Sequence, residues 1–338
     1  MAVVAATSIL IVAIVVGVGL WARGQIDPGG HPGAKVTVVI PSGASTSAIG
    51  DILAKAGVIH GSTLFPYYVK LNGSGSLFPG TYQLAKNSPY SAAVAALRAG
   101  PKLKVDKLVI PEGYTVAQIA QAVSLLPGMH LSAAALISAA SDGAVRSPYE
   151  PAGVNNLEGL LFPATYEVSQ GETVIDVLEQ MVGAFDDRAA EIGLATAAKG
   201  LGYSVYQVVT VASIVEREAK VSADFGPVAS TLYNRLRTGM SLGADSTQTY
   251  YLRLTDPTLV PTAVQLNQPS PYNTRLNKGL PPTPISAPGL AALQAAAAPP
   301  QTSYLYFVEI NPDGKLGFAS NAAGFASLQN QCRAAGLC

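Results

Sequence analysis

The chain has 338 residues, enough for more than one domain, yet only 12% of them are charged and the formal net charge is +0, whereas ordinary globular domains carry roughly 25% charged residues. It therefore lacks the basic surface that a nucleic-acid-binding protein needs, and we exclude nucleic acid as a partner. The three histidines (His31, His60 and His130) are scattered and the sequence contains no HExxH or CxxC motif, so we predict neither a metal site nor a cofactor.

An apolar segment comes first in the chain. Residues 2–21 contain no charge and no proline, and about 20 residues that rise about 1.5 Å each match a hydrocarbon core of about 30 Å. We predict a transmembrane helix over residues 1–22 and a flexible linker, rich in Gly and Pro, over residues 23–35. A buried core helix and a cleaved signal peptide are the alternatives. The first would be amphipathic, and the second would have a shorter apolar region behind basic residues.

Two similar segments follow the linker. IPSGASTSAI (40–49) and IPEGYTVAQI (110–119) share a Pro-Gly turn and a Ser or Thr that can cap a helix, and LFPGTYQL (77–84) and LFPATYEV (161–168) share LFPxTY. Their order predicts two related α+β units, unless turns bounded by proline simply reflect common local chemistry. We expect Tyr82 and Tyr166 of the shared Thr-Tyr pairs either to stack on sugar or to pack in the core.

The remainder of the chain is mostly helical in pattern. After residue 171 come helical segments, a loop rich in turn-formers at 268–289, a short helix at 290–298 and an alternating strand at 303–310. We therefore predict the α+β class, with an α-rich domain that ends in a small sheet. Cys332 and Cys338 fit a disulfide in an exported chain, and two free thiols are the alternative.

Two glutamates close an apolar helix predicted over residues 205–220. At about 100° per residue, Glu216 falls inside the apolar arc, and Glu218 falls at its margin. A carboxyl held against apolar neighbours has a raised pKa, as a general acid near neutral pH requires. The structural alternative is a buried ion pair between Glu216 and an arginine such as Arg235 or Arg275.

The two glutamates are predicted to differ in charge. We expect Glu216 to be protonated, and Glu218 to be ionised and paired with Arg217, Lys220 or a loop arginine. Thr210 and Ser213, together with Arg217 and Lys220, make up the polar face of the predicted helix.

Blocks along nearly the whole chain resemble, in order and spacing, the signature blocks of the endolytic murein transglycosylases, the MltG or YceG-like family. The blocks are IPSGAST (40–46), FPGTY (78–82), IPEGYTVAQIA (110–120), LEGLLFPATYEV (157–168), ASIVERE (212–218), YNRLRTGMSLGADSTQTYYL (233–252), PSPYNTRLNKGLPPTPISAPG (269–289) and AAAAPPQTSYLYFV (295–308). The resemblance implies a single-pass enzyme of the bacterial inner membrane. It further implies a LysM-like module over 36–108 and a YceG-like catalytic domain over 109–338, outside the cytoplasm. Within that domain, residues 109–170 form the second related α+β unit and residues 171–338 a lysozyme-like catalytic core.

The resemblance also implies a mechanism and a site. Neutral Glu216 protonates the oxygen between MurNAc and GlcNAc, and its carboxylate then takes the proton of the MurNAc C6 hydroxyl, which attacks C1 and leaves a 1,6-anhydro end. Glu218 and Glu158 are supporting candidates. The residues implied to line the glycan groove are Asn234, Asp245, Thr247, Tyr272, Asn273 and Thr274.

Three positions depart from the family pattern, and two other functions remain open. Gly243 and Ala244 stand where the family commonly has Gln and Ser or Thr, and Ala164 replaces a frequent Asp. The alternatives are a hydrolytic muramidase that uses Asp245 as a second carboxylate and a catalytically silent murein-binding scaffold. The implied partners are peptidoglycan strands and the membrane, with peptidoglycan synthases as candidate protein partners.

Overall fold

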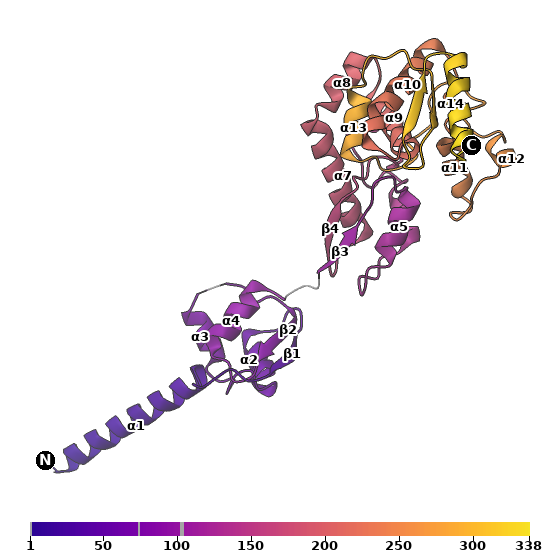
Figure 1. The fold of residues 1–338 in the computed structure, drawn as a ribbon. Helices are drawn as coiled ribbons and strands as arrows, with labels where there is room; N and C mark the ends of the chain where they lie inside the picture. Colours follow the sequence, from indigo (N-terminus) through magenta and orange to yellow (C-terminus); the bar gives the residue numbers. More distant parts are fainter. Residues whose placement is uncertain (1, 74, 102–104) are drawn as a thin grey trace. The chain divides into compact units, whose positions relative to one another are not determined.

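The chain divides into two compact units in the structure, a computed structural model that describes residues 2–73, 75–101 and 105–338 (Figure 1). The second unit begins at Val105, before the predicted boundary at 108/109, because Leu108 and its neighbours form a strand that pairs within the second unit. Met1 and residues 102–104, which the predicted segments include, lie outside the described residues. Each unit mixes helices with a small sheet, so the predicted α+β class is confirmed.

The first unit has one sheet of two strands and one core. Val38 of the first strand lies opposite Tyr82 of the second in an antiparallel register. Both side chains are buried in a core that the helices of the unit share. In chain order the elements are α1 (Ala2–Ile26), β1 (Lys35–Ile40), α2 (Thr46–Lys55), α3 (Phe65–Leu71), β2 (Gly80–Ala85) and α4 (Tyr90–Ala99).

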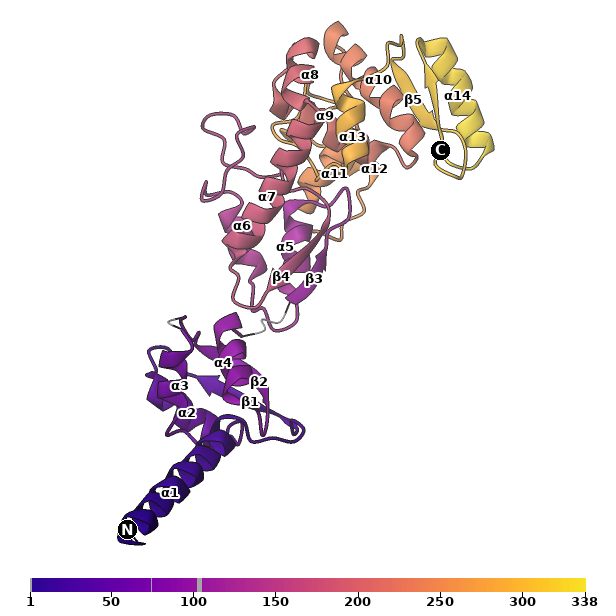
Figure 2. The same ribbon diagram turned by 90° about the vertical axis from the view of Figure 1, so that its left-hand side faces the viewer.

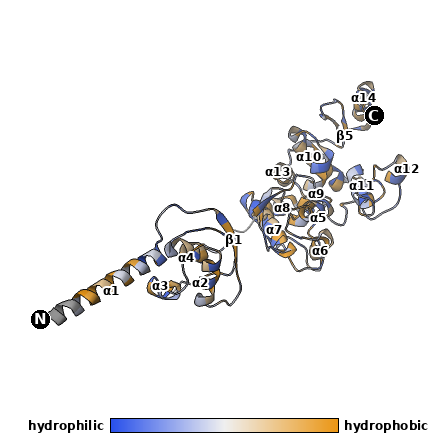
Figure 3. Ribbon diagram, turned by 90° about the horizontal axis from the view of Figure 1, so that it is seen from below, coloured by the Kyte–Doolittle hydropathy of each residue, from blue (hydrophilic) through white to orange (hydrophobic). Residues whose placement is uncertain are grey.

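Helix α1 is long and apolar enough to cross a membrane. The span Thr7–Ile26 has a mean hydropathy of 2.0 and none of it is buried, and Figure 3 colours much of the helix as hydrophobic. The alternative of a core helix is therefore wrong, because a core helix would be covered by protein. The helix ends at Ile26, beyond the predicted limit at residue 22, so that the linker shortens to residues 27–34.

The second unit opens with the same order of elements as the first. A strand leads into two short helices and an antiparallel strand, in which Leu108 lies opposite Tyr166. The helix after each first strand is capped by a hydroxyl, that of Ser45 or Thr115. The elements are β3 (Val105–Val109), α5 (Val116–Ser124), α6 (Ala133–Ala139) and β4 (Thr165–Ser169).

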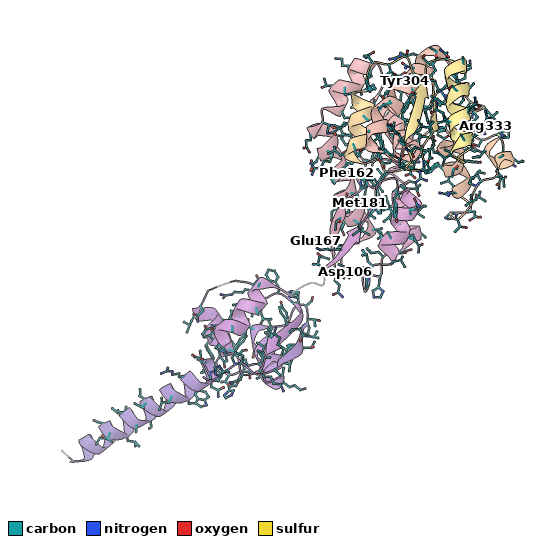
Figure 4. The ribbon with its side chains drawn as sticks, in the orientation of Figure 1. Asp106, Phe162, Glu167, Met181, Tyr304 and Arg333 are labelled. Carbon is teal, nitrogen blue, oxygen red and sulfur yellow. A yellow bond between two sulfur atoms is a disulfide. The ribbon has the colours of Figure 1, made fainter. Side chains whose placement is uncertain are left out.

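The two repeated tyrosines are core residues with equivalent contacts. Tyr82 is 3% exposed and Tyr166 is 8% exposed. The Tyr82 hydroxyl donates to the carbonyl oxygen of Phe78 at 2.6 Å, and the Tyr166 hydroxyl donates to that of Phe162 at 2.5 Å (Phe162 is labelled in Figure 4). The alternative in which they stack on sugar is therefore wrong. The shared LFPxTY motif encodes a hydrogen bond that closes a turn.

The rest of the second unit is built around helix α9 (Figure 2). This helix contacts α8, α10, α11 and α13. The elements of this part in chain order are α7 (Val174–Glu191), α8 (Leu194–Leu201), α9 (Val205–Glu218), the 3-10 turn η1 (Ser222–Asp224), α10 (Phe225–Thr238), α11 (Asp245–Arg253), α12 (Ala263–Leu266) and α13 (Leu290–Ala297).

Because α9 is covered on so many sides, part of its predicted polar face is buried. Thr210 is 2% exposed and Ser213 is 0% exposed. The Thr210 hydroxyl donates to the carbonyl oxygen of Tyr206, and the Ser213 hydroxyl donates to that of Thr210 and accepts from the N–H of Ile285. The prediction of a polar face through these two residues is wrong, because a hydroxyl that bonds to the backbone can be buried at little cost.

A small sheet and a disulfide complete the chain. Strands β5 (Tyr306–Glu309) and β6 (Leu316–Ala319) pair antiparallel, and α14 (Ala322–Ala334) follows. Cys332 and Cys338 form a disulfide. The predicted terminal sheet and the predicted disulfide are both present. Strand β5 is shorter than the predicted segment 303–310.

Candidate active site

The last turn of α9 places two carboxyl groups at the centre of the second unit. The helix starts at a capping box formed by Ser204 and Gln207 and runs through valines and alanines that are almost completely buried. Ala219, with φ −112° and ψ 133°, ends it. Glu216 and Glu218 are therefore fixed where a buried helix emerges between neighbouring elements.

Glu216 lies against the start of α13. Its Oε2 accepts a hydrogen bond of 3.0 Å from the N–H of Gly289, the residue that caps this helix. Gly289 also lies so close to Glu112 that a Cβ there would overlap the Glu112 carboxylate. Burial raises the pKa of the Glu216 carboxyl, the Gly289 hydrogen bond opposes that rise, and the nearby charge of Glu112 adds to it.

Glu218 lies against the start of α11. Its Oε1 accepts a hydrogen bond of 3.2 Å from the N–H of Ser246, in the first turn of that helix. Burial raises the pKa of the Glu218 carboxyl, hydrogen bonding from Ser246 opposes that rise, and the nearby charge of Asp245 adds to it. Both glutamates thus carry carboxyls that hold a proton more tightly than an exposed glutamate does.

The predicted ion pair of Glu218 does not form among the described residues. Lys220 pairs with Glu309, with Nζ 2.9 Å from Oε2, and Arg217 donates to the carbonyl oxygen of Gly113 at 3.4 Å. The prediction is wrong because α11 packs against α9 and the N–H of its Ser246 binds Glu218 in place of a cation. A projection of α9 alone cannot show that contact.

Glu218 lines a hollow of about 310 Å³, which we call the Glu218 hollow. Asp245 and Arg235 line it too. Asp245 is held by two hydrogen bonds from Arg275, at 2.5 Å and 2.6 Å. Arg235 is fixed by a bond of 2.6 Å from its Nε to the carbonyl oxygen of Leu305. The hollow therefore holds one carboxyl with a raised pKa beside charged groups that are already paired or anchored.

Gly243, a departure from the family pattern, also lines the Glu218 hollow. Its φ is +60°, a left-handed conformation that glycine adopts without strain. A Cβ at this position would lie 3.3 Å from Nη1 of Arg235. Glycine thus leaves room for that guanidinium in the wall of the hollow.

Three of the predicted groove residues instead join the start of α11 to the loop at 266–274. Thr247 and Thr274 contact each other through their hydroxyls at 3.0 Å, and both donate to the carbonyl oxygen of Ala244. Asn273 donates to the carbonyl oxygens of Leu266 and Gln268, at 3.0 Å and 2.7 Å. All three are buried and bind protein atoms, and their direct contact with glycan stays a prediction.

The other two predicted groove residues are also engaged within the protein. Asn234 donates from Nδ2 to the carbonyl oxygens of Thr302 and Tyr304, at 3.0 Å and 2.9 Å (Tyr304 is labelled in Figure 4). The Tyr272 hydroxyl lies 2.8 Å from the Thr283 hydroxyl. Each holds a loop of the second unit in place, and a role in binding glycan stays a prediction for both.

Glu158 lies away from the lining of the Glu218 hollow and caps helix α5. It is 3% exposed, accepts from the N–H of Val116 at 3.2 Å, and accepts from the Tyr250 hydroxyl at 3.0 Å. Burial raises the pKa of its carboxyl to about 7, against the effect of these hydrogen bonds. The predicted supporting residue is thus a buried cap with a carboxyl that titrates near neutrality.

Sequence analysis missed the donors that hold the two glutamates. Ser246 and Gly289 act through backbone N–H groups, which no side-chain pattern reveals. The available signal is indirect for Gly289, which precedes the predicted helix at 290–298, where N–H groups lack partners within the helix. For Ser246 there was no signal, because the helix that starts at Asp245 was not predicted. Among the described residues, no group of three or more His, Cys, Asp and Glu side chains could hold a metal ion.

Comparisons with known proteins agree over most of the chain. The sequence profile of the YceG-like family matches residues 38–331. An endolytic murein transglycosylase of Streptococcus pneumoniae serotype 2 (strain D39) is 32% identical over 311 residues, which covers 85% of this chain and 56% of that protein. This chain therefore spans little more than half the length of that relative.

Two further comparisons cover more of the other protein. An endolytic murein transglycosylase of Bacillus subtilis (strain 168) is 32% identical over 287 residues, which covers 81% of this chain and 78% of that one. The crystal structure of a yceG-like protein from Listeria monocytogenes is similar, with a TM-score of 0.58 and 33% identity. The matched region covers 87% of this chain and 99% of the Listeria chain.

Proposed function

The chain belongs to the YceG-like family, and from that premise we propose that it is an endolytic murein transglycosylase. The proposed reaction cuts the β-1,4 bond between MurNAc and GlcNAc inside a glycan strand and leaves a 1,6-anhydroMurNAc end. Two relatives named for this activity support the proposal. The observation that carries it is the pair of carboxyls with raised pKa values at the end of α9.

The reaction needs one group that gives a proton and then takes one back. The sequence prediction gives this role to Glu216, but the contacts favour Glu218. Glu218 lines a hollow, and the hydrogen bond from the N–H of Ser246 engages its Oε1. Glu216 is absent from the lining of that hollow and lies between α13 and the turn at Gly113. We therefore propose Glu218 as the acid and keep Glu216 as the competing candidate.

The proposed steps follow from that assignment. Neutral Glu218 donates its proton to the glycosidic oxygen, and the bond from that oxygen to C1 of MurNAc breaks. The C6 hydroxyl of the same MurNAc attacks C1, and the Glu218 carboxylate takes the hydroxyl proton. The carboxyl is thus restored without water.

The muramidase alternative needs Asp245 as a second, reactive carboxylate. Both Asp245 oxygens accept hydrogen bonds from Arg275, and a carboxylate held in this way is a weaker nucleophile and base. This pairing supports the transglycosylase over the hydrolase. The scaffold alternative makes no use of a carboxyl with a raised pKa.

We further propose that α1 anchors the enzyme in the bacterial inner membrane, with the rest of the chain outside the cytoplasm. The apolar span Thr7–Ile26 supports the anchor. The Cys332–Cys338 disulfide supports the oxidising side. The LysM-like character of the first unit and the lysozyme-like character of the catalytic core remain parts of this proposal, and peptidoglycan synthases remain candidate partners.

The test is digestion of purified murein by the full chain in detergent, with the released ends identified by mass spectrometry. If the chain is a transglycosylase that cuts within strands, the released fragments should be long and should carry anhydro ends. Reducing ends would instead establish the muramidase, and sedimentation with murein without any released fragment would establish the scaffold.

A further inference from the structure

A second hollow, of about 290 Å³, lies beside the two glutamates. We call it the arginine hollow, because Arg217 and Arg253 both line it, with Gln121, Tyr250 and Ile285 among the other lining residues. Arg217 belongs to the last turn of α9, and Arg253 is the last residue of α11. The packing of α11 against α9 therefore brings two cations to one hollow.

Neither arginine forms an ion pair among the described residues, although the charges of Glu216 and Glu218 act on Arg217 and oppose the lowering of its pKa by burial. Arg217 donates to the carbonyl oxygen of Gly113 at 3.4 Å, and Arg253 donates from Nε to that of Leu259 at 3.0 Å. Burial lowers the pKa of Arg217, and the charge of Arg253 lowers it further. The ion pairs of the described chain lie elsewhere: Arg146–Glu150, Arg188–Glu191, Lys220–Glu309 and Arg275–Asp245.

Two guanidinium groups held near each other repel, and an anion between them would remove that repulsion. An anion in this hollow would lie near the candidate acid, Glu218. Ser246 lines the arginine hollow, and its N–H binds Glu218. Ser246 therefore links the lining of this hollow to the candidate acid.

Resting on the proposed function, we propose that the arginine hollow binds a carboxylate of the murein stem peptide. The lactyl group of MurNAc is consumed in the amide link to that peptide, so the free carboxylates of murein are those of the peptide, beside small alkyl groups. Guanidinium groups bind carboxylates in a planar, two-bonded geometry. The Tyr250 and Ile285 walls suit the neighbouring alkyl groups. The enzyme would thereby prefer strands that still carry peptides.

The test measures binding apart from cutting, with the full chain in detergent. The probe is the disaccharide GlcNAc–MurNAc with its stem peptide, and the control is the same compound with its peptide carboxylates converted to amides, because removal of the peptide would expose the lactyl carboxylate. Neither contains the MurNAc–GlcNAc bond that the proposed reaction cuts. Equilibrium dialysis gives the Kd of each for the wild type, Arg253→Gln, Arg253→Lys and Arg188→Gln. Arg188 is an exposed arginine on α7 that pairs with Glu191, and it serves as the matched control.

We expect Arg253→Gln to weaken binding of the probe about tenfold, the loss of one charge-assisted contact, and to leave binding of the amidated control unchanged. Arg253→Lys keeps the charge and should recover part of the loss, and Arg188→Gln should match the wild type. In cutting assays, Arg253→Gln should raise KM on peptide-bearing strands with little change in kcat, and should change neither value on strands whose peptide carboxylates have been amidated.

Several results overturn the proposal. The proposal is overturned if the wild type binds the probe and the control with equal Kd. It is also overturned if Arg253→Gln weakens the binding of both by the same factor. Inorganic pyrophosphate is measured as a further ligand. If it binds through Arg253 while the peptide carboxylates do not change the Kd, the hollow is a phosphate site and the proposal is wrong. If the wild type prefers the probe over the amidated control through Arg253 but cuts no strand, the proposed reaction fails and the subsite stands. If melting curves show Arg253→Gln to be unfolded, the wild-type preference and Arg253→Lys decide.

Discussion

The buried cap Glu158 makes the stability of the second unit depend on pH in a calculable way. Burial raises the pKa of this carboxyl from its ordinary 4.5 to about 7. Between these two values the unfolded chain has released the proton and the folded chain still holds it. The free energy of unfolding therefore falls as the pH rises from about 4.5 to about 7, and this contribution is constant above that range. A pKa difference of about 2.5, at about 1.36 kcal/mol for each, gives about 3 kcal/mol.

Glu158→Gln removes that proton while it keeps the shape of the side chain. The amide oxygen can still accept from the N–H of Val116, and the amide N–H can donate to the Tyr250 hydroxyl. We expect the variant to gain about 3 kcal/mol relative to the wild type between pH 4.5 and pH 8. Other carboxyls with raised pKa values, among them Glu216 and Glu218, contribute equally to both proteins and cancel in the difference.

The measurement is urea unfolding of the full chain in detergent at pH 4.5 and pH 8, followed by circular dichroism and by hydrogen exchange of the α5 amides, which report on the second unit. Glu167→Gln, an exposed change on β4 (Figure 4), is the control. An identical difference between Glu158→Gln and the wild type at both pH values would refute the reasoning from burial.

Three further outcomes are expected. Glu218→Gln should lower turnover by about 10²–10⁴-fold in a murein-digestion assay while Glu216→Gln loses far less, and the reverse order would return the acid to Glu216. Asp245→Asn removes a negative neighbour of Glu218 and frees Arg275, so the pKa of Glu218 should fall. The alkaline limb of the pH–activity profile should then move to lower pH. An unmoved limb contradicts this reasoning, and loss of all activity favours the muramidase. Tyr166→Phe should cost about 1 kcal/mol in thermal unfolding, because it removes only the hydroxyl's bond to the backbone, and a loss of murein binding without a change in melting would contradict its placement in the core.

Local chemistry in the sequence predicted the elements well. The Ser45 and Thr115 caps and the LFPxTY turns each involve residues within four positions of one another, so the pattern and the contact coincide. Glu216 and Glu218 mark the limit of such reasoning. A helical projection treats α9 alone, whereas α11 and α13 decide which carboxyl is covered and which lines a hollow. Those helices start 27 and 72 residues after α9 ends, from 218 to 245 and from 218 to 290, and no periodicity in α9 reports on them.

Glu218 can act as an acid because the nearby cations form ion pairs with other residues. A lysine or arginine paired with Glu218 would stabilise its charged form and keep the pKa low. In the structure Lys220 is engaged by Glu309, and Arg275 by Asp245. The donor left for Glu218 is the N–H of Ser246, which orients the group and, being neutral, favours its charged form less than a full positive charge would. A carboxyl held in this way can lose a proton and regain it, which a transglycosylase with a single acid requires.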